Sequence, residues 1–132
     1  MKRSLAVKVT TVAIIGYSLA ILIGSLMAMP PLPENLEGIP PDKKIHFFAY
    51  FVLSVSWMLY LHLVIFNKEK FWKALTLTFF GSFVYGLIIE VLQASLTDSR
   101  SGDVWDLLAN TLGILTGIFV ISLIRSQVPV LK

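Results

Sequence analysis

Four long apolar segments constrain this chain more than any other feature of its sequence. Segment 9–28 carries no charged residue, and segments 46–66, 71–96 and 104–124 together carry only Lys73, Glu90 and Asp106. Each segment has about 20 residues or more, the length that an α-helix needs to cross the hydrocarbon core of a bilayer. The sequence therefore predicts an all-α fold: a single domain over residues 1–132, built as a polytopic membrane bundle of four antiparallel transmembrane helices.

The composition agrees with a membrane setting. Hydrophobic residues make up 56% of the 132 residues and charged residues 14%, whereas a soluble domain carries about 25% charged residues. There is no cysteine, which excludes disulfides and thiolate chemistry. No Gly-rich phosphate loop, Ser-His-Asp order or metal-protease motif is present, and the basic residues are scattered, so we expect the lipid bilayer as a partner, no nucleic acid and no cofactor.

The first segment also resembles the basic and apolar regions of a signal peptide, because Lys2, Arg3 and Lys8 precede it. It is long enough to span the membrane, and no small-x-small cleavage site follows it, since Leu26 lies three residues before a cut after Ala28. We therefore predict a retained helix that packs against the others.

Lysine and arginine in the short loops predict the orientation. With the N-terminus inside, the inner side holds eight of the eleven basic residues and the outer side holds Lys43, Lys44 and Arg100. This bias predicts a multi-pass protein of the cell membrane with both termini in the cytoplasm. The start of the second helix, the end of the third and the start of the fourth then lie in one outer layer.

Polar residues follow helical spacing in that layer. They recur every three or four residues and so form one stripe on each of three helices. The stripes are Asp42, His46, Tyr50 and Ser54; Gly86, Glu90, Gln93 and Thr97; and Asp106, Asn110, Gly113 and Gly117. Lipid would not tolerate these groups, so the stripes are expected to face each other inside the bundle, where the glycines allow close approach.

Glu90 is the most unusual of these residues. It lies six residues before Leu96, which is about 9 Å from the predicted helix end. A bare carboxylate at that depth is costly, so it should be protonated, paired or hydrated. Arg100 is the first choice of partner and His46 the second.

The chain resembles the VanZ-like family in three stretches, "DKKIHFFAYFVLS" (42–54), "EVLQ" (90–93) and "RSGDVWDLLANTLGILTG" (100–117). The matching positions are Asp42, Lys43, His46, Tyr50, Glu90, Gln93, Arg100, Asp106, Asn110 and Gly113. A departure is "TDSR" before the arginine, where the family often has a Pro-Gly turn. The resemblance implies a small integral membrane protein of the cell envelope and a link to glycopeptide resistance, specifically to teicoplanin; it implies no settled reaction.

One hypothesis is a binding or catalytic site open to the outer leaflet. Glu90 and His46 would be catalytic and exchange a proton. Arg100 and Lys43 would hold a phosphate or carboxylate of a lipid-linked cell-wall precursor. The other residues of the predicted ligand site are Asp42, Tyr50, Gln93, Asp106 and Asn110.

Other hypotheses stay open beside it, and whether the protein is an enzyme is left undecided. The polar network can be structural, in a non-enzymatic protein that modulates a partner: His46 would bond at the interface, Glu90 and Arg100 would form an ion pair, and Asp106 and Asn110 would cap the fourth helix, with Asp103 at its N-cap. A small transporter, with Glu90 as a proton site, is a third. A metal variant would use His46, Glu90 and Asp106 as ligands, but no short ligand motif supports it, and no metal is predicted.

Overall fold

The computed structural model describes residues 2–27, 40–66, 68–96 and 103–131. In these ranges all regular secondary structure is helical, with four long helices: α1 (Lys2–Leu26), α2 (Pro41–Leu59), α3 (Phe71–Leu96) and α4 (Val104–Ile124). Each is long and apolar enough to cross a membrane. The all-α, four-span architecture is therefore confirmed.

The helix bounds follow the predicted segments closely at α3 and α4 and less so at α1 and α2. The first two helices begin before their apolar segments, at Lys2 and Pro41, because charged residues interrupt hydropathy without interrupting helical hydrogen bonding. Pro41 at the first helical position fits this start, since its missing N–H has no partner to lose there. The predicted irregular connection 29–41 lies outside the described residues except for its last two.

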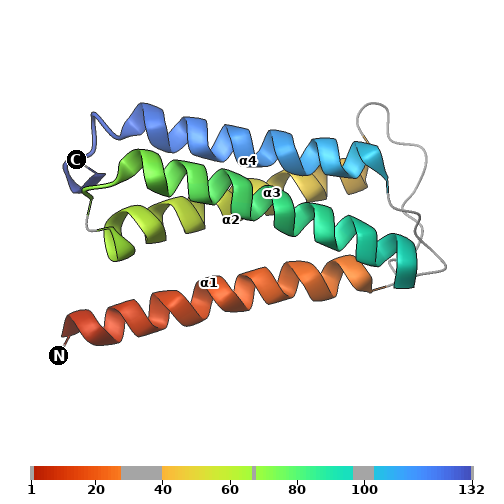
Figure 1. The fold of residues 1–132 in the computed structure, drawn as a ribbon, viewed down its shortest axis with the longest axis horizontal. Helices are drawn as coiled ribbons and strands as arrows, with labels where there is room; N and C mark the ends of the chain where they lie inside the picture. The colour runs from red at the N-terminus through yellow and green to blue at the C-terminus, as the bar shows by residue number, and fades with distance from the viewer. Residues whose placement is uncertain (1, 28–39, 67, 97–102, 132) are drawn as a thin grey trace.

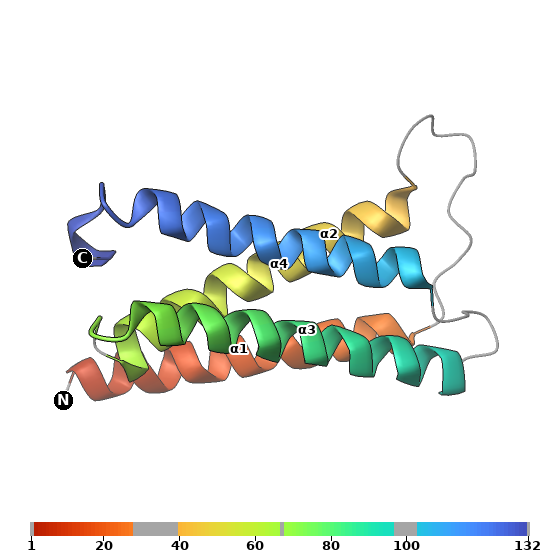
Figure 2. The ribbon, with the colours of Figure 1, turned by 45° about the horizontal axis from the view of Figure 1, so that its top comes forward.

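The four helices run antiparallel, and the two ends of the chain lie at the same end of the bundle (Figure 1). The α2–α4 interface is the most extensive, and α2 slants across the bundle between α4 on one side and α1 and α3 on the other (Figure 2). We call the end where α1 and α3 finish and α2 and α4 begin the polar end.

Two glycines allow the close approach of α4 to α2. A Cβ added at Gly113 would lie 2.3 Å from the Phe47 carbonyl oxygen, and one added at Gly117 would lie 2.1 Å from Ser54 Oγ. Any side chain at these positions would push the helices apart, so the predicted small-residue stripe forms the α2–α4 contact.

Helix α1 packs more loosely than the others and is tied to them by hydrogen bonds. Only 11% of its apolar span is buried, against 39% for α4. Tyr17 Oη donates to the Ala49 carbonyl at 3.0 Å, Gln93 Nε2 donates to the Ser25 carbonyl at 2.6 Å, and Tyr85 donates to the Ser18 carbonyl. Polar contacts of this kind hold helices together where the surrounding lipid is as apolar as the helix surface.

Opposite the polar end, α2 continues into a π-helical turn, η1 (Tyr60–Ile65). It carries the fully buried His62, whose Nε2 lies 3.0 Å from the carbonyl oxygen of Leu131 in the short 3₁₀ turn η2 (Pro129–Leu131). The π-helical turn thus ties the second helix to the C-terminal segment, a contact that the sequence interpretation did not include.

Candidate functional site at the polar end

The predicted stripes lie inside the bundle, where α2, α3 and α4 meet. The residues His46, Tyr50, Glu90, Asp106 and Asn110 are all less than 9% exposed. They come from three helices, and helical periodicity brings each into the same layer of the polar end. Burial is therefore confirmed for the described stripe residues except Asp42, which is half-buried at the start of α2. Thr97 lies outside the described residues, and the chemical roles of the stripes stay predictions.

Lys43 joins the starts of α2 and α4. Its Nζ lies 2.9 Å from Asp42 Oδ2, 2.6 Å from Asp103 Oδ2 and 2.5 Å from Asp106 Oδ1. Three ammonium hydrogens can satisfy three acceptors, so the donors of Lys43 are already directed at carboxylates. A single anion at Lys43 would have to displace one of them.

Asp103 has a second role as the N-cap of α4. Its Oδ1 accepts a hydrogen bond from the backbone N–H of Trp105 at 2.9 Å, so the predicted cap is confirmed. The hydrogen bond from Lys43, followed by the one from Trp105, lowers the pKa of the Asp103 carboxyl below its ordinary value. Its bond to Lys43 was not predicted, because it depends on how α2 and α4 pack.

A second set of contacts joins α2, α3 and α4 one layer deeper. His46 Nδ1 lies 3.0 Å from Asn110 Oδ1, and Asn110 Nδ2 lies 3.5 Å from Glu90 Oε1. The backbone N–H of Asp103 reaches Glu90 Oε2 at 3.4 Å. Glu90 thus receives two long hydrogen bonds, weaker than the short contacts around Lys43.

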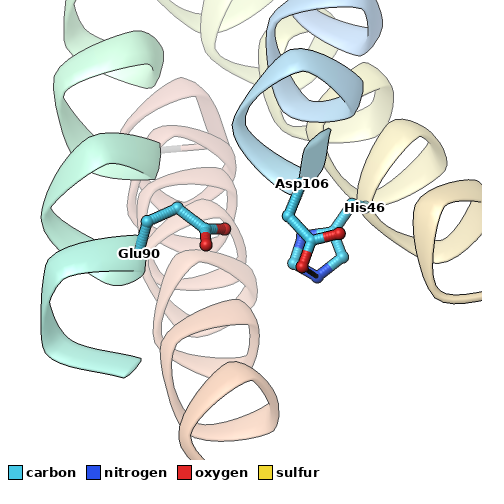
Figure 3. Close-up of side chains that lie close together, drawn as sticks. All are labelled: His46, Glu90 and Asp106. Atoms are coloured by element: carbon cyan, nitrogen blue, oxygen red, sulfur yellow. Dashed lines mark ion pairs between the residues drawn. The ribbon is translucent and has the colours of Figure 1, made fainter. Parts of the chain in front are cut away.

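Glu90, His46 and Asp106 point toward one another from α3, α2 and α4 (Figure 3). One ligand-type atom from each lies within 4.8 Å of the other two, and His46 Nε2 is 3.7 Å from Asp106 Oδ2. Arg100, the first choice of partner for Glu90, lies outside the described residues. His46, the second predicted partner of Glu90, does lie beside it in the structure.

Tyr50 and Gln93 occupy the edges of this cluster. The Tyr50 hydroxyl is buried and has no hydrogen-bond partner among the described residues. Gln93 directs its amide nitrogen at Ser25 and so contacts the end of α1. This hydrogen bond joins α1 to the cluster.

A cavity of about 240 Å³ separates α1 from α2 beside the cluster. Asp42, His46 and Tyr50 of α2 line it, and α1 adds the hydroxyl-bearing Tyr17 and Ser25. Its remaining lining residues are apolar: Ala20, Ile21, Gly24, Ile45 and Ala49. The cavity is therefore largely apolar along α1 and meets charged and polar groups along α2. A second cavity, of about 360 Å³ and lined by Trp57, Tyr85 and other uncharged residues, lies away from the cluster.

A protein-family model matches residues 42–125, and it describes the VanZ/LLP1 family. The chain belongs to the VanZ/LLP1 family. The matched stretch contains every described residue of the polar cluster, whereas α1 precedes it. The described residues of this cluster are Asp42, Lys43, His46, Tyr50, Glu90, Gln93, Asp103, Asp106 and Asn110. A comparison with curated proteins and a comparison with solved structures give no match.

Proposed function

We propose that this VanZ/LLP1 protein binds an amphiphile of the cell envelope at its polar end, with a lipid-linked cell-wall precursor as the ligand class. The observation that supports the proposal is the cavity between α1 and α2, which is largely apolar along α1 and carries Asp42, His46 and Tyr50 along α2. An isoprenoid or acyl chain fits the first wall, and the polar headgroup reaches the second.

The orientation belongs to the same proposal. The distribution of lysine and arginine favours cytoplasmic termini, and the termini lie at the end of the bundle opposite the polar cluster (Figure 1). The polar end then faces the outer leaflet, where the cavity is accessible to a precursor that has crossed the membrane.

The charges of the described residues favour particular headgroup contacts. Around Lys43 and His46 lie four carboxylates, those of Asp42, Glu90, Asp103 and Asp106. Carboxylates accept hydrogen bonds from hydroxyl and amide groups, so the sugar and peptide parts of a precursor suit them. A phosphate would meet net negative charge there and requires Arg100, as the sequence predicts, or a bound cation.

Binding can be measured with the purified protein in detergent micelles and a polyprenyl-pyrophosphate-linked cell-wall precursor. Gly24 lines the cavity, and a Cβ placed there has no atom within 4 Å, so Gly24→Leu extends a side chain into the space without a clash at its Cβ. Gly16→Leu is the matched control on the same helix: it also has free space and does not line this cavity. We expect Gly24→Leu to weaken binding by about tenfold or more and Gly16→Leu to bind like the wild type. Equal affinities of the two variants would refute the proposal.

The contacts of Lys43 favour a second candidate function, a structural network in a partner-modulating protein. Lys43 joins three carboxylates and ties α2 to α4, which is what a purely structural cluster requires. Glu90→Gln and His46→Ala separate the two functions. If both variants accumulate in the membrane but lose precursor binding, the binding site is supported; if both fail to accumulate, the structural network is favoured.

A further inference from the structure

The side chains of His46, Glu90 and Asp106 bring three ligand-type atoms to one point. The three side chains are buried and come from three different helices. His46 Nε2 and Asp106 Oδ2 are 3.7 Å apart, beyond the usual range of a hydrogen bond. The three atoms of the trio lie within 4.8 Å of one another, so a small cation between them could contact all three after modest side-chain adjustment.

Asn110 determines which nitrogen of His46 faces the carboxylates. Glu90 is an acceptor, so the Asn110 amide directs Nδ2 toward it and leaves Oδ1 for the imidazole. Since an amide oxygen accepts hydrogen bonds, His46 Nδ1 must carry the proton at this 3.0 Å contact. In the neutral imidazole, Nε2 is then a bare lone pair that faces Asp106.

This arrangement matches the outer sphere of a metal-bound histidine. Such a histidine donates its other ring N–H to a carbonyl or carboxylate, which fixes the tautomer and the ring orientation. Asn110 provides that acceptor for His46. Lys43 holds the other oxygen of Asp106 at 2.5 Å, which leaves Oδ2 directed at the imidazole. Both supporting contacts therefore orient a ligand atom toward the same point.

Tyr50 provides an independent observation. Tyr50 as a whole is 1% exposed, and its hydroxyl has no hydrogen-bond partner among the described residues. It lies 3.3 Å from where a Cβ on Gly86 would be, which places it against α3 one turn from Glu90. A buried hydroxyl without a partner is costly, and a water held by a cation in the trio would satisfy it.

We propose that His46, Glu90 and Asp106 bind a divalent first-row metal ion, Zn²⁺ or Mn²⁺. Two carboxylates and a neutral imidazole balance the charge of the ion, and imidazole favours these metals over Ca²⁺ and Mg²⁺. Three protein ligands leave coordination positions for water. A headgroup phosphate oxygen could replace that water, a role that rests on the proposed function, whereas metal binding itself does not.

The first test is metal binding by the full chain in detergent micelles, without any precursor. After chelation and dialysis, we expect one Zn²⁺ or Mn²⁺ per chain by calorimetry and by elemental analysis, with excess Mg²⁺ unable to compete. Pulsed electron paramagnetic resonance of the Mn²⁺ form should show coupling to a coordinated ¹⁴N that is lost in His46→Gln and kept in His62→Gln. Absence of stoichiometric binding by the folded wild type would overturn the proposal.

Carboxylate variants separate coordination from general charge attraction. Glu90→Gln and Asp106→Asn each remove one charge within the trio, whereas Asp103→Asn removes one charge from the Lys43 contacts outside it. We expect the two trio variants to weaken metal binding by about 100-fold or more and Asp103→Asn to bind metal nearly like the wild type. An equal loss in Asp103→Asn and the trio variants would contradict coordination by the trio. Metal binding without precursor binding would refute only the proposed function.

Discussion

Gly113→Ala tests the packing that holds the polar cluster together. A Cβ at this position would lie 2.3 Å from the Phe47 carbonyl oxygen and 3.0 Å from the Phe51 nitrogen, whereas ordinary contact begins at 3.4 Å. Both neighbours are backbone atoms of α2, so neither can rotate away. The helices must therefore separate locally by about 1 Å, and overpacking of this kind costs about 1–3 kcal/mol. Because the backbone cannot yield, we expect a loss near 3 kcal/mol.

Gly81→Ala is the matched control for this change. Gly81 lies within α3, and a Cβ there meets no atom within 4 Å. It therefore gains only the helix propensity of alanine, a stabilisation of about 1 kcal/mol or less. The difference between the two variants isolates the clash, because the chemical change is the same in both.

The assay is equilibrium unfolding in mixed micelles with increasing dodecyl sulfate, followed by tryptophan fluorescence. The same clash should disturb the site, because His46 precedes Phe47 and its 3.0 Å contact with Asn110 would open beyond hydrogen-bond reach. Metal and precursor binding should therefore weaken in Gly113→Ala and persist in Gly81→Ala. If both variants unfold at the same midpoint, the proposed role of close α2–α4 contact is wrong.

Three further predictions concern the charged residues and the topology. Lys43→Met should destabilise the protein by about 2 kcal/mol, because it leaves partly buried carboxylates without their counter-charge; adding Asp106→Asn should recover part of the loss, and unfolding midpoints that fail to show this recovery would contradict the account. The pKa of Asp103 is lowered on folding, so its stabilising contribution is present above the ordinary aspartate range and is lost as pH falls below about 4; acid unfolding of Asp103→Asn should lack that component, and an unchanged acid profile would exclude it. In this cysteine-free chain, a cysteine at position 35, in place of Asn35, should react with an impermeant maleimide added outside the cell, and labelling only after the membrane is opened would reverse the orientation.

The family resemblance also predicts an effect of this protein on susceptibility to teicoplanin. Expression of the wild-type chain in a susceptible Gram-positive host should raise the inhibitory concentration of teicoplanin, and Glu90→Gln, accumulated to the same level, should not. A rise that is equal for both would separate resistance from the polar site.

The sequence predicted much of the fold because lipid imposes simple rules on it. The apolar segments 71–96 and 104–124 agree with the observed α3 and α4, since Asp103 caps the start of α4 and marks a boundary that is visible in the sequence. The starts of α1 and α2 were less predictable because helices continue past the charges that end an apolar segment. The π-helical turn at Tyr60–Ile65 has no evident signal in the sequence.

The candidate site was likewise predicted only in part from the sequence. Helical spacing predicted that His46, Glu90, Asp106 and Asn110 lie inside the bundle, because polar side chains in lipid must find partners. Spacing along one helix cannot specify the distances between helices, so the three carboxylates around Lys43 were missed. His62 was also missed, although it continues the four-residue spacing of His46, Tyr50 and Ser54 at the other end of the helix.

Because α1 packs loosely, the shape of the apolar cavity can change independently of the ion pairs at the polar end. Helix α1 forms one wall of the 240 Å³ cavity, yet it lies before the matched stretch 42–125. Among the described residues, the ion pairs of the cluster lie within α2 or join α2 to α4 and its cap. Exchanging α1 for that of a relative would therefore reshape the apolar compartment and leave the chemistry of the polar end in place. On the proposed function, substitutions in α1 would then change which apolar chain the cavity accepts and leave the polar side chains of α2, α3 and α4 unchanged.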